Sequence, residues 1–177
     1  MNDRTVTEAE DRDAIIDVLH RSRIAVWTQD FETYASCFVH ADYVTRWNAS
    51  RHVGMFRREG WNDIAARVRK TFEEQALLIK EYAYDTRIEN LHLRIIGDMA
   101  WATFDQIYPS VDQDRHYYHG GTSHEVRVLE RHDGSWLIAF LGVMHGSIGR
   151  PDTPVLHVTA DGTVTRKSPA AAAALED

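Results

Sequence analysis

The chain has 177 residues, 44% of them hydrophobic and 27% charged, which is the length and composition of one soluble globular domain. Its formal net charge of −7 argues against a nucleic-acid-binding or anionic-membrane-binding surface, because both kinds of surface need clustered lysine and arginine. A single cysteine, Cys37, excludes an intrachain disulfide and a cysteine zinc cluster, and we expect its thiol to be buried and inert.

The first part of the chain predicts a helix and no targeting segment. The opening residues, MNDRTVTEAEDRD, are too polar for a signal peptide, and no long apolar run occurs, so we expect a cytoplasmic protein. Thr7 and Glu10 have the spacing of a capping box, which predicts a helix start. The residues predicted to form its buried face then recur at helical spacing: Ile15, Val18, Leu19, Ser22 and Val26.

Two further helices and a strand are predicted before residue 80. Asp30 stands at the N-cap position of a short helix, whose apolar face is formed by Phe31, Tyr34, Ala35 and Phe38. The segment 40–47 then changes to a strand-like period. After Gly60, apolar residues at helical spacing predict a third helix over 61–80.

From residue 84 onward the pattern predicts two β-hairpins. The first joins 85–96 to 99–109 through Gly97-Asp98, and the second joins 122–132 to 135–148 through Asp133-Gly134, which is the stronger turn signal. Helices first and antiparallel strands afterwards predict an α+β fold, with the helices on one face of a curved sheet. The tail contains a third, short hairpin about Asp161-Gly162, followed by an alanine-rich segment.

Asp105 is a lone acid within the predicted strand 99–109. It shares one face of that strand with Trp101 and Thr103, whereas the other face carries Ala100, Ala102, Phe104 and Gln106. Periodicity does not say which face is concave, and a β-bulge would exchange the two. If Asp105 faces an aromatic pocket, burial raises its pKa and makes it a usable general acid or base; otherwise it is an exposed strand acid.

Four segments in order carry a family resemblance. They are Tyr34-Ala35-Ser36-Cys37-Phe38 with Val39-His40-Ala41-Asp42, Gly60-Trp61-Asn62-Asp63-Ile64, Gly97-Asp98-Met99-Ala100-Trp101-Ala102-Thr103, and Val128-Leu129-Glu130-Arg131-His132-Asp133-Gly134-Ser135-Trp136. Over residues 8–150 the chain resembles the SnoaL-like branch of the nuclear-transport-factor-2-like superfamily. The resemblance implies a cone-shaped domain, in which a strongly curved antiparallel sheet wraps around N-terminal helices and encloses an internal pocket. We assign residues 1–150 to this domain and 151–177 to a C-terminal extension.

The resemblance also implies a homodimer formed through the sheet. The last predicted strand agrees with this, because both of its faces are apolar. We expect Trp136, Ile138, Phe140 and Met144 on one face and Leu137, Ala139, Leu141 and Val143 on the other.

The candidate catalytic residues are Asp105, His124 and Tyr34. A histidine beside a carboxylate is the usual proton-transfer pair, and a tyrosine can donate a hydrogen bond to a developing oxyanion. The alternative for His124 is a structural, hydrogen-bonded histidine. The candidate ligand-binding residues are aromatic, although such residues also build ordinary cores: Trp27, Trp47, Trp61, Phe104 and Phe140.

Motifs for cofactors are missing from the sequence. There is no HExxH, no His-x-His, no GxSxG and no glycine-rich phosphate loop, so we expect no metal and no nucleotide cofactor. We therefore expect a protein that binds a small apolar or aromatic molecule, with isomerase, dehydratase or cyclase chemistry as the enzyme hypothesis. The alternative is a non-catalytic ligand-sensing or protein-interaction domain of a larger bacterial regulator, since residues 155–175 resemble a region of LuxR-type regulators.

Overall fold

The computed structural model describes residues 7–50, 54–74, 86–111, 117–145, 155–158 and 164–167. The chain divides into two compact units, Met1–Gly146 and Ser147–Asp177. In the second unit β7 (Val155–Val158) pairs with β8 (Val164–Lys167) in antiparallel fashion, as the predicted third hairpin requires. The turn at Asp161-Gly162 and the alanine-rich segment lie outside the described residues.

The helices begin where their caps predict. Helix α1 (Glu8–Thr28) starts with the complete capping box, in which the Glu10 amide donates to Thr7 Oγ1 at 3.2 Å and the Thr7 amide donates to Glu10 Oε2 at 2.8 Å. Helix α2 (Phe31–Ser36) starts with Asp30, whose Oδ1 accepts a hydrogen bond from the Thr33 amide. Helix α3 is described over Trp61–Glu74, and residues 75–80 of the predicted helix lie outside the described residues. In the described part of the chain, no helix combines the length and the apolar character needed to cross a membrane.

The six remaining strands form one open sheet in the order β2-β1-β6-β5-β4-β3. Their bounds are Thr45–Ser50 for β1, Gly54–Glu59 for β2, Arg87–Ile96 for β3, Met99–Val111 for β4, Tyr117–His132 for β5 and Ser135–His145 for β6. All neighbours are antiparallel except β1 and β6, which are parallel. Both predicted hairpins are confirmed, and Asp133 and Gly134 have the positive φ angles, 49° and 79°, of a type I′ turn.

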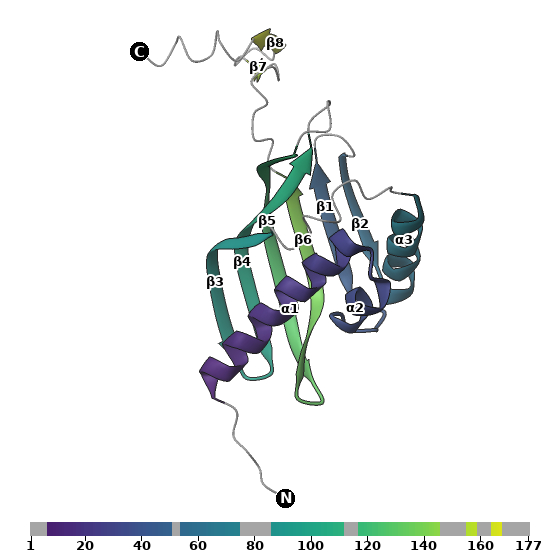
Figure 1. Cartoon of the computed structure of the whole chain (residues 1–177), viewed down its shortest axis with the longest axis vertical. Coiled ribbons are helices and arrows are strands. Elements are labelled where there is room, and N and C mark those ends of the chain that lie inside the picture. Colours follow the sequence, from purple (N-terminus) through teal and green to yellow (C-terminus); the bar gives the residue numbers. More distant parts are fainter. Residues whose placement is uncertain are drawn as a thin grey trace, which may run out of the picture. The chain divides into compact units, whose positions relative to one another are not determined.

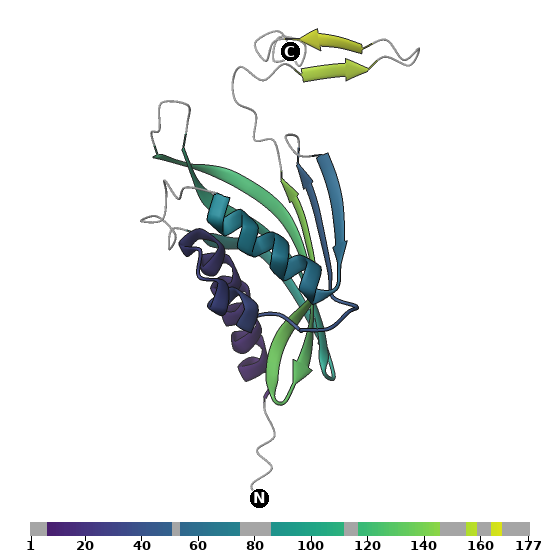
Figure 2. The same cartoon turned by 90° about the vertical axis from the view of Figure 1, so that its right-hand side faces the viewer.

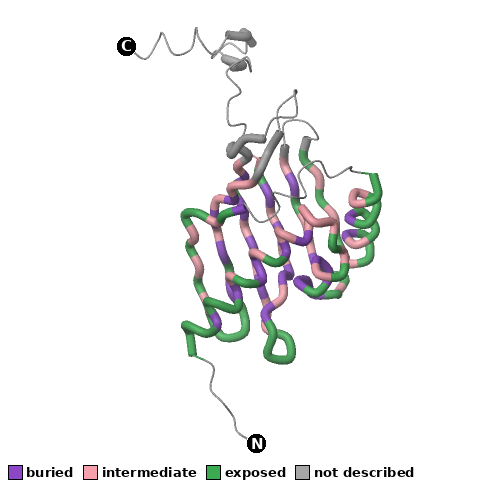
Figure 3. Tube along the Cα trace, in the orientation of Figure 1, coloured by how far each residue is buried: buried purple, intermediate pink, exposed green. Residues whose placement is uncertain are grey.

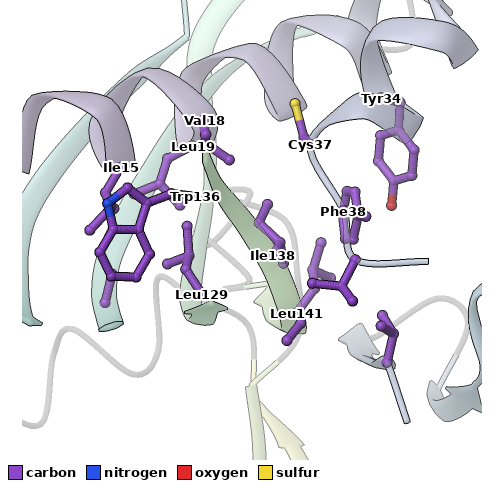
Figure 4. Close-up of a cluster of buried hydrophobic side chains, with 14 of the residues drawn as sticks. Ile15, Val18, Leu19, Tyr34, Cys37, Phe38, Leu129, Trp136, Ile138 and Leu141 are labelled. Atoms are coloured by element: carbon purple, nitrogen blue, oxygen red, sulfur yellow. The ribbon is translucent and has the colours of Figure 1, made fainter. Parts of the chain in front are cut away.

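The helices lie on one face of this sheet, which we call the inner face; the opposite side is the outer face (Figures 1 and 2). Figure 3 shows buried positions alternating with more exposed ones along the strands, as expected when only one face is covered. The core lies between α1 and the inner face, where Ile15, Val18 and Leu19 cluster with Leu129 and Ile138 (Figure 4). The α+β class predicted from the sequence is confirmed.

A β-bulge corrects the predicted faces of β6. Between Val128 and Leu129 of β5 the pairing passes from Phe140 to Ile138, so Ala139 is the extra residue. Trp136 and Ile138 therefore face inward together with Leu141 and Val143, whereas Phe140 and Met144 face outward. The prediction that Phe140 and Met144 share a face with Trp136 and Ile138 is wrong, because the bulge shifts the alternation by one residue.

Candidate functional site

Strand β5 carries a buried polar row on its inner face. Ser123, Glu125 and Arg127 are spaced by two residues and all point inward, with exposed fractions of 0%, 2% and 5%. Charged side chains are almost never this buried unless they are paired. The row is therefore a built feature of the interior rather than an accident of the strand pattern.

Glu125 is held by three neighbours. Its Oε1 accepts a hydrogen bond from Ser123 Oγ at 2.6 Å and lies 3.3 Å from Arg23 Nη2 of α1, and its Oε2 pairs with Arg127. Burial alone would raise the pKa of Glu125, but the charges of Arg127 and Arg23 and these hydrogen bonds together lower it to about 2. Glu125 is therefore ionised at neutral pH.

Three polar atoms next to this ion pair are buried without a hydrogen-bond partner among the described residues. They are Tyr34 Oη, Asn48 Oδ1 and Arg127 Nε. The three side chains belong to α2, β1 and β5, so three separate elements bring them to one interior. A buried polar group without a partner costs about 1 to 3 kcal/mol, and native proteins contain few of them. These atoms therefore mark this interior as the candidate site.

A partly exposed rim borders the buried atoms. The Arg23 guanidinium lies 5.6 Å from the Trp27 ring centroid and 5.1 Å from that of Tyr108, and the two rings are 5.7 Å apart. The Nδ1 atom of His145 lies 3.2 Å from Tyr108 Oη, and its Nε2 atom lies 3.4 Å from Asn48 Nδ2. Burial, followed by the charges of neighbouring arginines, lowers the pKa of His145, which favours the neutral imidazole. We call these residues the interior cluster: Arg23, Tyr34, Asn48, Glu125, Arg127 and His145.

Four of the predicted site residues lie on the helix-covered side of the sheet. Tyr34 of α2 is 2% exposed and stacks near Phe38, with ring centroids 4.6 Å apart, and its hydroxyl points away from α2 (Figure 4). Trp61 of α3 stacks parallel to the His40 ring at 4.2 Å. The Phe104 ring lies 5.4 Å from the Arg127 guanidinium, so together with Trp27 it borders the interior cluster.

Trp47 and Phe140, also predicted as ligand-binding residues, lie on the outer face instead. Their rings contact each other edge to face at 5.5 Å, and Trp47 is 50% exposed. Each of the two belongs to a strand whose inward positions are occupied by other residues, such as Asn48 and Leu141. These two aromatic residues are thus separated from the interior cluster by the sheet itself.

Asp105 and His124 converge as predicted, but on the outer face. They stand opposite each other on β4 and β5, with His124 Nδ1 2.5 Å from Asp105 Oδ1, and Asn90 Nδ2 donates to Asp105 Oδ2 at 2.7 Å. The His124 side chain is 62% exposed. The hydrogen bonds from Asn90 and His124 lower the pKa of Asp105, whereas the expectation for an enclosed aromatic pocket was a raised value. The pair is therefore not enclosed in an aromatic pocket.

Sequence reasoning missed Arg23, Asn48, Glu125 and Arg127. Serine and charged residues at every second position of SHEVRV are typical of a solvent-facing strand side, and the valines between them suggested the buried side. The structure reverses this: Val126 and Val128 lie outward. The available signal was Arg23, a charged residue in helical register with the buried Leu19. Among the described residues, no group of three or more His, Cys, Asp or Glu side chains is placed to hold a metal ion.

An N-terminal helix lying across a curved sheet, with polar groups buried between the two, gives this chain the fold of nuclear-transport-factor-2-like proteins. More particularly, the chain belongs to the SnoaL-like domain family, whose family model matches residues 7–141. The resemblance inferred from the sequence is confirmed. A comparison with curated proteins gave no match.

Solved structures share the fold at low identity. A nuclear transport factor 2-like superfamily protein from Salmonella enterica matches with a TM-score of 0.60 and 16% identity, over 81% of this chain and 97% of that chain. An NTF2-like protein with a cystatin-like fold from Novosphingobium aromaticivorans has a TM-score of 0.58 and 16% identity, over 80% and 86% of the two chains. The association domain of C. elegans CaMKII has a TM-score of 0.56 and 20% identity, over 77% and 95%.

Proposed function

We propose that this SnoaL-like domain binds a small organic molecule with an apolar or aromatic body between α1, α2 and the inner face of the sheet. The observation that carries the proposal is the set of buried atoms without a partner among the described residues, Tyr34 Oη, Asn48 Oδ1 and Arg127 Nε. A polar end of the ligand would satisfy these atoms, while Trp27 and Phe104 contact its apolar body. A few convergent polar groups beside aromatic side chains are the usual composition of a small-molecule site.

The indole N–H signals of the five tryptophans offer a direct test. Trp27, Trp61 and Trp136 lie on the helix-covered side, whereas Trp47 and Trp101 lie on the outer face. A panel of small aromatic molecules is titrated into ¹⁵N-labelled protein, with each indole signal assigned by a Trp→Phe variant. We expect interior ligands to shift the Trp27 signal and to leave those of Trp47 and Trp101 unchanged.

Tyr34→Phe supplies the matched variant, because it removes one unpartnered hydroxyl and keeps the ring. We expect it to weaken binding about tenfold, since one hydrogen bond to the ligand is lost. A panel that moves only the outer-face indoles, or none, contradicts the proposal.

The contact between Asp105 and His124 supports a second candidate, the proton-transfer chemistry of the isomerase, dehydratase or cyclase kind. A carboxylate 2.5 Å from an imidazole has the geometry of an acid–base pair. Because His124 is exposed, the reaction would need a second surface that covers the pair. Exchange of a ligand's carbon-bound hydrogen for deuterium in D₂O measures proton transfer directly. If the pair is catalytic, Asp105→Asn stops the exchange while interior binding persists.

Without exchange, ligand binding supports the alternative of a ligand-sensing domain in a larger bacterial regulator. The same interior cluster serves that function, since sensing requires binding and no turnover. We also propose that two copies associate through the outer face, which carries exposed apolar side chains such as Trp47, Trp101 and Met144. A similar fold occurs in the association domain of C. elegans CaMKII, a domain named for association.

A further inference from the structure

The charges around the interior cluster do not balance. Three guanidinium groups, those of Arg23, Arg46 and Arg127, act electrostatically on the Tyr34 hydroxyl, and Arg23 and Arg46 also act on His145. Among the described residues, one carboxylate, Glu125, lies with them, and it is already bound to Arg23 and Arg127. Arg46 makes no ion pair with any described residue. The interior therefore has an excess of positive charge, which is costly in a buried place unless an anion compensates it.

The unpartnered atoms have one chemical character. The described residues hold seven buried side-chain polar atoms that find no partner among them, and six of these seven carry a hydrogen. Those in or beside the interior cluster are Arg23 Nε, Trp27 Nε1, Tyr34 Oη, Arg46 Nε and Arg127 Nε, with Asn48 Oδ1 as the single pure acceptor. A group that satisfies this set must be rich in acceptor oxygens. A carboxylate has two acceptor oxygens and the negative charge, and arginine hydrogen bonds to it are among the strong ones.

The arrangement also tells which donors remain available. The Nη1 atom of Arg127 already donates hydrogen bonds to the carbonyl oxygens of Val126 and Gly142, at 3.0 and 3.2 Å, and its Nη2 atom pairs with Glu125. Its guanidinium is thereby fixed, with Nε left over. The partly exposed side chains of Trp27 and Tyr108 stand beside Arg23 at the rim, and their rings can contact an aromatic body.

We infer that the ligand of the interior site is a small aromatic carboxylate, with its carboxylate among Arg46, Arg127 and Tyr34 and its ring beside Trp27. This inference rests on the proposed function, since it names the ligand class of the same site. Glu125 holds Arg23 and Arg127 in place rather than contacting the ligand, so it is a positioning residue.

Pairs of probes that differ only in charge test the inference. We use 2-naphthoate with 2-naphthamide and phenylacetate with phenylacetamide, and measure the Kd of each by calorimetry, with the Trp27 indole signal as the reporter of place. We expect each acid to bind at least about tenfold tighter than its amide, because a hydrogen bond to a charged group is stronger than one to a neutral group.

Arg46→Met is the deciding variant. Arg46 is half-buried and forms no ion pair with any described residue, so its replacement breaks no such contact and should leave the fold intact. We expect it to lower the acid-over-amide preference to within about threefold of unity while leaving amide binding unchanged. Arg94→Met on the outer face is the matched control and should keep the full preference.

The outcomes separate the two proposals. Equal affinity for acid and amide, or an undiminished preference in Arg46→Met, overturns the carboxylate inference and leaves the proposed function standing. If neither member of any pair shifts the Trp27 signal, both the inference and the proposed function are wrong.

Discussion

Glu125 is the residue whose ionisation contributes most clearly to stability. Its pKa is about 2 in the folded chain and 4.5 ordinarily, so folding favours the charged form. The resulting stability, about 3 kcal/mol, is fully present above pH 4.5 and is lost as the pH falls toward 2. We expect the free energy of unfolding, measured in urea at successive pH values, to fall across this window.

Glu125→Gln isolates that contribution. Asp11 and Asp105 also have lowered pKa values and lose stability in acid, so the wild-type slope alone does not identify the residue. In Glu125→Gln the unfolding free energy should start lower at pH 7, because Arg127 is left buried and unpaired, and should fall less steeply in acid. Parallel pH curves for the two proteins would contradict the assignment.

Whether the position of a single side chain could be predicted depended on whether the local sequence pattern agreed with its surroundings in the fold. Tyr34 was found because an aromatic residue at helical spacing predicts an inward position regardless of its hydroxyl. Glu125 and Arg127 were missed because a charged residue on a strand usually faces water, and only the ion pair with Arg23, 102 residues away from Glu125 in sequence, makes their burial tolerable. Asp105 and His124 were correctly paired, yet their face was set by the helices and not by the strand itself.

At the scale of elements, a polar clamp joins the start of α1 to two hairpins. Asp11 Oδ1 accepts a hydrogen bond from Trp136 Nε1 at 3.0 Å, and its other oxygen pairs with Arg131. Arg131 also lies 3.2 Å from Asp98 in the β3–β4 turn. We expect Asp11→Ala to lower the free energy of unfolding by about 2 to 3 kcal/mol, because a mostly buried indole N–H and a guanidinium lose their acceptor.

Asp17→Ala on the same helix is the matched control. Asp17 pairs with Arg21 at 2.6 Å, but both side chains are largely exposed, so the pair contributes less than about 0.5 kcal/mol. Chemical denaturation followed by circular dichroism compares the two variants. Equal losses would show that Asp11 does no more than an ordinary surface acid.

Helices and strands could be predicted where the interactions that form them join residues close together in the sequence. The capping box at Thr7 and the turns at Gly97-Asp98 and Asp133-Gly134 are local, and each predicted its element correctly. Strand β2, with the sequence GMFRRE, was not predicted, because a short edge strand rich in charge has no alternating apolar face. The parallel pairing of β1 with β6 joins residues about a hundred positions apart, and no local pattern encodes it.

At the scale of the whole molecule, the outer face carries exposed apolar side chains. It presents Trp101, which is 44% exposed, beside Met99, Ile96 and Val128 in a shallow apolar depression. Exposed apolar surface of this kind on a monomer marks an interaction site. Val126 and Val128 of β5 also lie outward, and the charged pair beside them, Asp105 of β4 and His124 of β5, is already bound to itself. Apolar contacts rather than charge would therefore drive association.

We therefore expect the wild-type chain to sediment as a dimer of the 20.3 kDa protein and to dissociate on dilution. Trp101→Glu should shift the equilibrium to the monomer, because it places a charge in the apolar contact without disturbing the core. Ala66→Glu on the exposed side of α3 adds the same charge away from the outer face and should leave the dimer intact. Analytical ultracentrifugation over a concentration series decides the matter: a wild-type monomer throughout, or a dimer that persists in Trp101→Glu, means that the apolar outer face serves another partner.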